Sequence, residues 1–325
     1  MTDHQIWAYL VENQNESQPI GMIERFQHSG LLLIDKPPGV TSFEVVRRVR
    51  KALKVKKVGH LGTLDPFATG LLPLALGEAT KLTPFLMEER KTYLATCRLG
   101  VETDTQDFTG QVVAKTEEMP EPPAIYRAAA ALVGEIEQTP PAYSAVHYQG
   151  ERLYCLVRRG LKVAVPPRRV TVFRLEVTEV NLPLVTFLVE CGKGTYVRAL
   201  AHDLGRALGC GAHLVALSRL AVGPFRLDEA LSLEQVEKAL SPEEVRARII
   251  SLPQCLPRLK GVVVDRLKAR RLAQGQALPW TENGLAVGEQ VKVLADDNLV
   301  AVAEVRLQGA GRVLAPLRVF LAARE

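Results

Sequence analysis

The residues best suited to chemistry lie between Val58 and Leu72, in the sequence VGHLGTLDPFATGLL. Asp65 is the one acid of this stretch, and His60 precedes it among small and apolar residues. The glycines and Pro66 exclude a regular helix or a central strand through its middle, so the backbone must turn tightly. A lone carboxylate on an apolar loop has a specific partner or takes part in a reaction, although an Asp-Pro pair is also a common start of a turn.

Arg198 is the candidate partner of this carboxylate. Residues 191–214, CGKGTYVRALAHDLGRALGCGAHL, predict a strand that ends at glycines and continues into a helix, with Arg198 at the junction. An arginine there is either a surface residue or holds a buried carboxylate with its planar guanidinium, and Asp65 is the unpaired candidate. A neighbouring cation would keep Asp65 ionised inside an apolar pocket.

The elements before the loop must hold it in place. Residues 31–34 predict a short buried strand, and the prolines and glycine of residues 35–39 require a turn. Thr41 and Glu44 have the spacing of a capping box, which predicts the start of a helix. The residues expected on the core face of this helix are Phe43, Val46, Val49 and Leu53.

The rest of the chain alternates strand and helix patterns. We expect a strand at 93–99, and an Ala-rich helix at 124–136 with Ile125, Leu132 and Ile136 inward. Strands at 170–180 and 184–191 should pair antiparallel, and helix start signals stand at Ser232 and Ser241. Beyond a boundary at 251–257, strands at 262–264, 291–294, 299–306 and 313–320 with a helix at 266–273 predict a small β-barrel module.

Positive charge is clustered along the chain. The predicted helix after residue 41 and its extension carry Arg47, Arg48, Arg50, Lys51, Lys54, Lys56 and Lys57, and no acid lies between Glu44 and Asp65. A solvated helix face is the plain alternative, but an unmixed run favours contacts with phosphates. A third basic cluster in the C-terminal module consists of Lys260, Arg266, Lys268, Arg270 and Arg271.

Residues 139–169 combine basic side chains with tyrosines and prolines. They include His147, and the six Arg or Lys residues from Arg152 to Arg169 have no acid among them. This composition suits a flap that grips a folded nucleic acid through phosphates and stacked bases, and it suits a long surface hairpin equally well.

Composition excludes several classes of protein. The 325 residues, 47% of them hydrophobic, suffice for one large and one small domain, and the net charge of +5 is modest. Five scattered cysteines without metal-ligand spacing indicate reduced, mostly buried thiols in a cytoplasmic protein. No apolar run approaches the roughly 20 residues of a membrane span, and residues 1–29 look like a polar extension without a secretory signal.

Five stretches together carry a family resemblance: LLLIDKPPGVTS, GHLGTLDPFATGLLPLALGEATK, KTYLATCRLGVETDTQD, PPAYSAVHYQGERLY and GTYVRALAHDLGRALGCGAHL. From about Gly30 to Pro257 the chain resembles the bacterial TruB family of tRNA pseudouridine synthases. The resemblance implies isomerisation of uridine-55 in the T arm of tRNA, without metal or cofactor. It also implies an α+β fold, with a mixed, mainly antiparallel sheet flanked by helices in residues 30–255 and a PUA-like β-barrel in 256–325.

The resemblance assigns roles to particular residues. Asp65 would be the catalytic carboxylate, paired with Arg198; His60 would lie beside the flipped-out nucleotide, and Tyr93 would stack on the target base. Lys36, followed by Pro37, would support the loop, and Leu217 would line the pocket wall. Residues 139–169 would form the RNA-gripping thumb. The residues expected to contact RNA are Arg47, Arg48, Lys51, Lys56, Lys57, His147, Arg152, Arg158 and Arg159.

The sequence departs from the family pattern at Leu61, at His147 and in the longer leader. Two other functions use the same features. A binding-only RNA chaperone would need only the basic surfaces, and a metal-dependent nuclease would need further carboxylates, of which Asp35, Asp104 and Asp107 are the nearest. We expect a monomer that binds tRNA and requires neither a membrane nor a protein partner.

Overall fold

The computed structural model describes residues 29–320, apart from 142, 144–146, 149–150, 153–155, 157–158, 160, 162–164, 282–283 and 310. Of the predicted extension at 1–29, only Ser29 is described. In the described part of the chain, no helix is long and apolar enough to cross a membrane.

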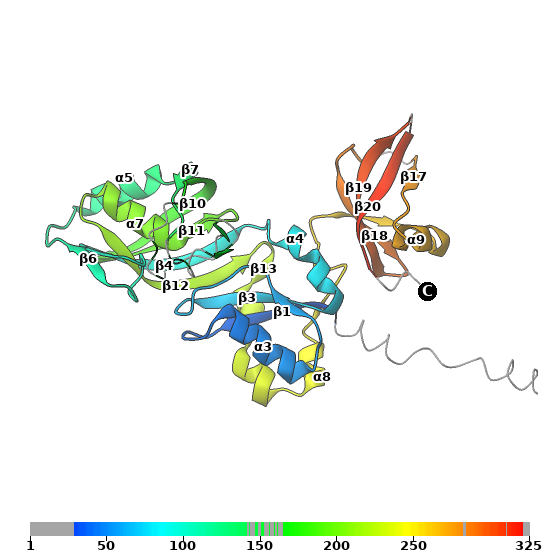
Figure 1. Ribbon diagram of the computed structural model, residues 1–325, viewed down its shortest axis with the longest axis horizontal. Coiled ribbons are helices and arrows are strands. Elements are labelled where there is room, and N and C mark those ends of the chain that lie inside the picture. Colours follow the sequence, from blue (N-terminus) through cyan, green and yellow to red (C-terminus); the bar gives the residue numbers. More distant parts are fainter. Residues whose placement is uncertain are drawn as a thin grey trace, which may run out of the picture.

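An eleven-stranded sheet forms the body of the protein (Figure 1). Its main order is β14-β1-β3-β12-β4-β11-β10-β7, and β15, β2 and β13 pair with β1, β3 and β12. The strands are β1 (Gly30–Lys36), β2 (Val58–His60), β3 (Thr69–Leu76), β4 (Lys91–Leu99), β7 (Gly134–Gln138), β10 (Arg168–Asn181), β11 (Leu184–Cys191), β12 (Ala212–Val222), β13 (Phe225–Arg226), β14 (Leu231–Ser232) and β15 (Ile250–Ser251).

The sheet is mixed and mainly antiparallel, as the resemblance implied. The pairs β1 with β14 and β3 with β12 are parallel, and the others are antiparallel. The pairing of β3 with β12 is short, with Ser218 opposite Thr69 and Arg219 opposite Gly70. The two halves of the sheet therefore meet at this junction.

Helices cover both halves of the sheet. In Figure 1, α5 (Pro122–Ala131) and α7 (Val197–Ala207) lie beside one end, while α3 (Ser42–Leu53) and α8 (Pro242–Arg246) lie beside the other. Both groups contribute to one hydrophobic core, with Val49 and Leu200 fully buried. The remaining short elements are η1 (Gly77–Leu82), α4 (Thr83–Leu86), β5 (Val101–Thr103), β6 (Val112–Lys115), β8 (His147–Tyr148), β9 (Glu151–Arg152), η2 (Leu227–Glu229) and the π-helical turn η3 (Gln235–Ala239).

Two local predictions were wrong. Phe43 is 69% exposed rather than part of the core face of α3. Ser42 turns inward instead, because its hydroxyl bonds the backbone of the next loop, and Val45 fills the core. The helix expected at 124–136 stops at Ala131, since Gly134 with φ of +115° leads the chain into β7, which pairs with β10 and carries Ile136.

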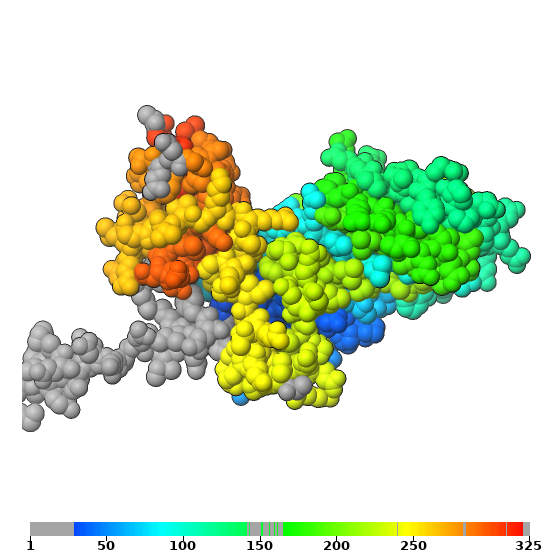
Figure 2. All heavy atoms as spheres, turned by 180° about the vertical axis from the view of Figure 1, so that it is seen from behind, coloured from blue at the N-terminus to red at the C-terminus, as the bar shows by residue number. Residues whose placement is uncertain are grey.

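The C-terminal residues form a separate five-stranded sheet in the order β16-β18-β19-β20-β17, with α9 (Arg266–Ala273) packed against it. Its strands are β16 (Lys260–Val263), β17 (Leu278–Trp280), β18 (Gln290–Ala295), β19 (Asn298–Gln308) and β20 (Gly311–Val319). The predicted strands and helix are confirmed, and β17 is an addition. Figure 2 shows this module as one lobe beside the larger body. Val302 and Phe320 belong to the same buried hydrophobic cluster as Leu31 and Leu33 of β1, so the two lobes share a core.

Candidate active site

The loop that carries Asp65 spans residues 61–68, between β2 and β3. Its backbone is fixed by a side chain and by the backbone of neighbouring elements. Ser42 Oγ donates to Leu64 O at 3.1 Å and accepts from Leu64 N at 2.8 Å. Gly39 N donates to Pro66 O at 2.8 Å. The loop therefore holds a defined shape without regular secondary structure.

Lys36 makes hydrogen bonds to the backbone of this loop and of the turn before it. It is fully buried at the end of β1, and its Nζ donates to Pro37 O at 3.0 Å, to Val40 O at 2.8 Å and to Pro66 O at 3.0 Å. Burial lowers the pKa of Lys36 to about 8, against the opposing attraction of Asp65. Lys36 thus ties the turn after β1 to the loop of Asp65 by backbone contacts.

Asp65 and Arg198 meet, as the sequence suggested. Arg198 Nη2 donates to Asp65 Oδ1 at 3.2 Å, and Nε lies 2.9 Å from Oδ2 as an ion-pair contact. The Asp65 side chain lies deep among protein atoms, yet it keeps 32% of its surface exposed, so a substrate can reach it. Burial raises the pKa of Asp65 above its ordinary value, while Arg198 opposes that rise.

Asp107 is a site residue that sequence reasoning missed, having considered it only as a possible metal ligand. Arg198 Nη1 donates to Asp107 Oδ2 at 3.2 Å, and further guanidinium hydrogens go to Thr105 O at 3.0 Å and Tyr143 O at 2.9 Å. Asp107 is 3% exposed and accepts from the Thr109 backbone. The turn-rich sequence DTQDFTG was the available signal. Arg198 is therefore held between two carboxylates, Asp65 and Asp107.

Tyr93 lies on β4, opposite Arg219 of β12, and is 9% exposed. Burial raises the pKa of Tyr93, and the Asp65 charge raises it further, so the two groups are close enough to interact electrostatically. Leu217 is 8% exposed and lies opposite Ala95, on the same pair of strands. The structure thus brings Tyr93, Leu217 and Asp65 to the junction of the two half-sheets.

His60 ends β2, opposite Leu74 of β3. It is half-buried, and the loop of Asp65 begins at the next residue. The strand pairing with β3 therefore fixes the backbone of His60 at the entrance of that loop.

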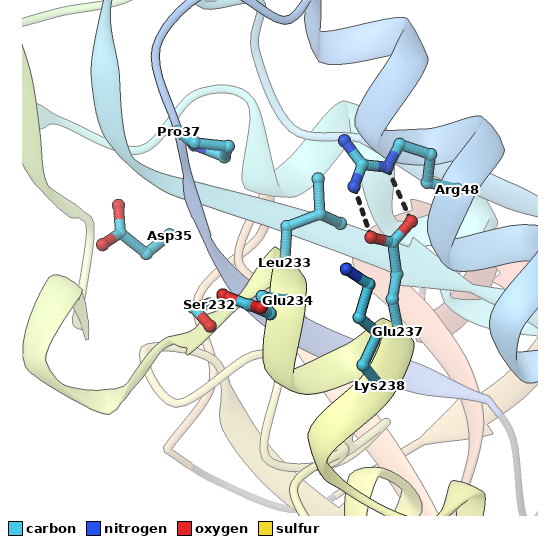
Figure 3. Close-up of a pocket in the computed structure, with 8 residues that line it drawn as sticks. All are labelled: Asp35, Pro37, Arg48, Ser232, Leu233, Glu234, Glu237 and Lys238. Atoms are coloured by element: carbon cyan, nitrogen blue, oxygen red, sulfur yellow. Dashed lines mark hydrogen bonds and ion pairs between the residues drawn. The ribbon is translucent and has the colours of Figure 1, made fainter.

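The basic residues of α3 and of the segment that follows it differ in their surroundings. Lys51, Lys56 and Lys57 are exposed. Arg47 pairs with Glu44 of its own helix at 2.6 Å. Arg48 makes a bidentate pair with Glu237, seen in Figure 3 in a groove of about 440 Å³. That groove is lined by Asp35, Pro37, Arg48, Ser232, Leu233, Glu234, Glu237 and Lys238.

The predicted thumb is described only in part. Arg158 and the side chains of His147 and Arg152 lie outside the described residues. The backbones of β8 and β9 pair antiparallel, and Arg159 forms an exposed ion pair with Glu151. The roles expected of these residues stay predictions.

Cys191 lies close enough to Tyr93 and Arg219 to interact with them electrostatically, but its thiol stays protonated at neutral pH. Cys97, Cys191, Cys210 and Cys255 are free and buried, as expected, and burial raises the pKa of Cys191 to about 12. In the described part of the chain, no three His, Cys, Asp or Glu side chains gather as metal ligands would. The carboxylate cluster that a metal-dependent nuclease requires is therefore not formed there.

Comparison with known proteins identifies the family. Residues 50–197 match the N-terminal domain of the TruB family pseudouridylate synthases, and residues 198–256 match the C-terminal domain of tRNA pseudouridylate synthase B. The chain is 44% identical over 283 residues to tRNA pseudouridine synthase B of Geobacter sulfurreducens, covering 85% of this chain and 93% of that protein. The chain belongs to the TruB family of pseudouridylate synthases.

Other relatives agree with this assignment. The TruB protein of Burkholderia pseudomallei, named tRNA pseudouridine synthase B, is 44% identical over 297 residues, covering 90% of this chain and 97% of its own. Among solved structures, a Cbf5-Nop10-Gar1 complex matches with a TM-score of 0.70 and 28% identity, covering 95% of this chain and 92% of the matched one. An H/ACA RNP bound to a substrate RNA containing 2′-deoxyuridine matches with a TM-score of 0.68 and 26% identity, with the same coverage. The fold is that of a pseudouridine synthase.

Proposed function

We propose that this protein converts uridine-55 in the T arm of tRNA to pseudouridine, with Asp65 as the carboxylate that acts on the nucleotide. The protein is a tRNA pseudouridine synthase, an isomerase of the TruB family. The observation that carries the assignment of Asp65 is its contact with Arg198: a reachable carboxylate is held 2.9 Å from a buried guanidinium.

The reaction explains why a single carboxylate suffices. The C1′–N1 bond must break and a C1′–C5 bond must form, so the base is detached, rotated and kept in place. This requires a nucleophile or a charge stabiliser in a closed pocket that excludes water. Asp65 would attack C1′ or C6, or would stabilise an oxocarbenium-like centre. Arg198 favours the ionised carboxylate that each route needs.

The remaining site residues bind and orient the nucleotide in this proposal. Tyr93 offers a flat ring for the base and a hydroxyl for proton transfer, and Leu217 forms the apolar wall beside it. His60 stands beside the flipped-out nucleotide. Lys36 acts indirectly, because its ammonium is fully committed to backbone carbonyls of the supporting turn and loop.

Flipping the uridine out of a folded T loop costs a few kcal/mol of stacking. We propose that phosphate contacts made by exposed basic residues offset this free-energy cost. The main candidates are Lys51, Lys56 and Lys57, together with Arg47. The thumb at 139–169 and the C-terminal module, interpreted as PUA-like, would extend this surface. A monomer is sufficient, since one tRNA arm occupies one such site.

The decisive experiment measures pseudouridine in a T-arm stem-loop RNA with a single uridine at the target position. Wild type and Asp65→Asn are compared in EDTA. We expect conversion by wild type, loss of about 10⁴-fold or more in rate for Asp65→Asn, and unchanged RNA binding by that variant. Turnover by Asp65→Asn would refute the catalytic role. Tight binding without conversion by either protein would favour the RNA-chaperone function.

A further inference from the structure

Arg219 is a buried arginine that the family resemblance left without a role. It lies on β12 at the junction of the half-sheets, opposite Tyr93 of β4 and opposite Gly70 of β3. Its side chain is only 1% exposed. Within the described part of the chain, its guanidinium donates hydrogen bonds to two backbone carbonyls, which are neutral. A buried cation held this way is costly, which points to a function for its position.

Two hydrogen bonds of Arg219 link the two ends of the Asp65 loop, at Gly62 and Leu71, which we call the neck of the loop. Nε donates to Leu71 O at 2.7 Å, and Nη2 donates to Gly62 O at 3.1 Å. Gly62 precedes Asp65 and Leu71 follows it. One planar guanidinium therefore joins the chain segment that enters the loop to the segment that leaves it. A lysine would present its donors from a single nitrogen, so it would lack the planar fork with which Arg219 reaches the two carbonyls from two different nitrogens.

The other neighbour of Arg219 is Tyr93, which lies directly opposite it on the paired strand β4, so both side chains leave the sheet on the same face. Arginine has donors only, so the oxygen is the atom of the Tyr93 hydroxyl that the facing guanidinium attracts. We therefore expect the hydroxyl hydrogen of Tyr93 to be directed away from the positive charge of Arg219 and to be available to another acceptor. The positive charge also opposes the rise in the pKa of Tyr93 that burial causes.

We propose that Arg219 is a positioning residue for pseudouridine formation: it closes the neck of the Asp65 loop and leaves the Tyr93 hydroxyl hydrogen free for donation to the flipped uridine. The inference rests on the proposed roles of Asp65 and Tyr93. It adds a link between them, since one side chain holds the loop of the carboxylate and orients the hydroxyl.

The test compares kcat and KM on the T-arm stem-loop for wild type, Arg219→Gln and Arg219→Lys. We expect Arg219→Gln to lower kcat by about tenfold or more, with KM changed by less than about threefold, because RNA-binding surfaces are untouched. Arg219→Lys should recover part of the loss, since it keeps the charge and an ammonium that can donate to at least one of the two carbonyls. Arg98→Gln is the matched control, an exposed arginine on the opposite face of β4 from Tyr93, and it should behave as wild type.

A double-mutant cycle with Tyr93→Phe separates positioning from a merely structural role. The part of the Arg219 contribution that passes through the hydroxyl is already absent in Tyr93→Phe, so Arg219→Gln should cost less there than in wild type. Equal cost in both backgrounds, or an unchanged kcat in Arg219→Gln, would overturn the inference. If thermal unfolding shows that Arg219→Gln does not fold, Arg219→Lys takes its place in the cycle.

Two sets of outcomes separate the role of Arg219 from the proposed function. If wild type does not convert the uridine, or if Asp65→Asn still does, the proposed function falls. If both behave as expected and the cycle is additive, only the role of Arg219 falls.

Discussion

Arg198 Nε lies 2.9 Å from Asp65 Oδ2, although the two residues are 133 positions apart in the sequence. The same guanidinium reaches Asp107 with Nη1, at 3.2 Å from Oδ2. One arginine thus serves two carboxylates, of which Asp107 is almost fully buried and Asp65 remains reachable. Asp107 anchors the cation, and the cation orients Asp65.

Asp107→Asn should therefore impair catalysis without removing Asp65. The amide keeps an acceptor for Arg198 but loses the charge that fixes it, so the guanidinium is held less firmly. We expect kcat on the stem-loop to fall about 10²-fold with KM nearly unchanged. Asp104→Asn is the control, because this exposed aspartate of the same loop contacts the Gln111 backbone and not Arg198. Equal activities of the two variants would contradict the anchoring role.

The pH dependence of stability should reveal the burial of Asp65. Its pKa in the folded protein is raised above the ordinary 3.8, mainly by burial. Below pH 3.8 the carboxyl is protonated in both the folded and unfolded states. As pH rises through the folded pKa, the unfolded state has already ionised, and the stability contributed by the protonated form is lost.

Asp65→Asn removes this titration, so the variant should be more stable than wild type at pH 7. The difference in the free energy of unfolding should shrink as the pH falls toward 3.8. Denaturant unfolding at several pH values measures it. A variant that is less stable than wild type at pH 7 would show that the Arg198 contact outweighs the cost of burial.

Gly70→Ala should destabilise the junction of β3 and β12. Gly70 has φ of +95°, and a Cβ there would lie 2.4 Å from Arg219 O and 2.7 Å from Arg219 N. Gly134→Ala is a matched control, because Gly134 has φ of +115° with no atom within 4 Å of a Cβ. Backbone strain should cost each variant about 1–3 kcal/mol of unfolding free energy. The clash should cost Gly70→Ala about 1–3 kcal/mol more. Equal losses would contradict the close packing.

Salt dependence should identify the basic residues that contact RNA. Removing Lys51, Lys56 or Lys57 singly should weaken binding and reduce the slope of log K against log salt by about 0.7–1 for each phosphate left without its lysine. Arg48→Ala should change the slope less, because Glu237 already holds that guanidinium. Fluorescence titrations of the stem-loop at several salt concentrations measure both. A larger change for Arg48→Ala would show that RNA displaces Glu237.

The sequence by itself determined the features that depend on local patterns. Glycines and Pro66 around Asp65 predicted a shaped loop, and the Thr41 and Glu44 spacing predicted the start of α3, where Thr41 does cap Glu44 N. Both of the later start signals, at Ser232 and Ser241, form reciprocal capping bonds. Such signals can be recognised because the residues that interact are neighbours in the chain.

Only the tertiary structure decided which buried polar groups meet. The turn-rich sequence around Asp107 did not reveal its partner, and Arg219 gave no signal of its own, because their partners come from strands, loops and a helix far away in the chain. Tertiary contact also overrode local periodicity at two places. Ser42 rather than Phe43 turned inward, since a hydroxyl can satisfy the loop backbone, and residues 134–138 became a strand because β10 offered them an edge. The physical reason is that a buried donor or acceptor must find a partner, and the fold alone determines which partner is within reach.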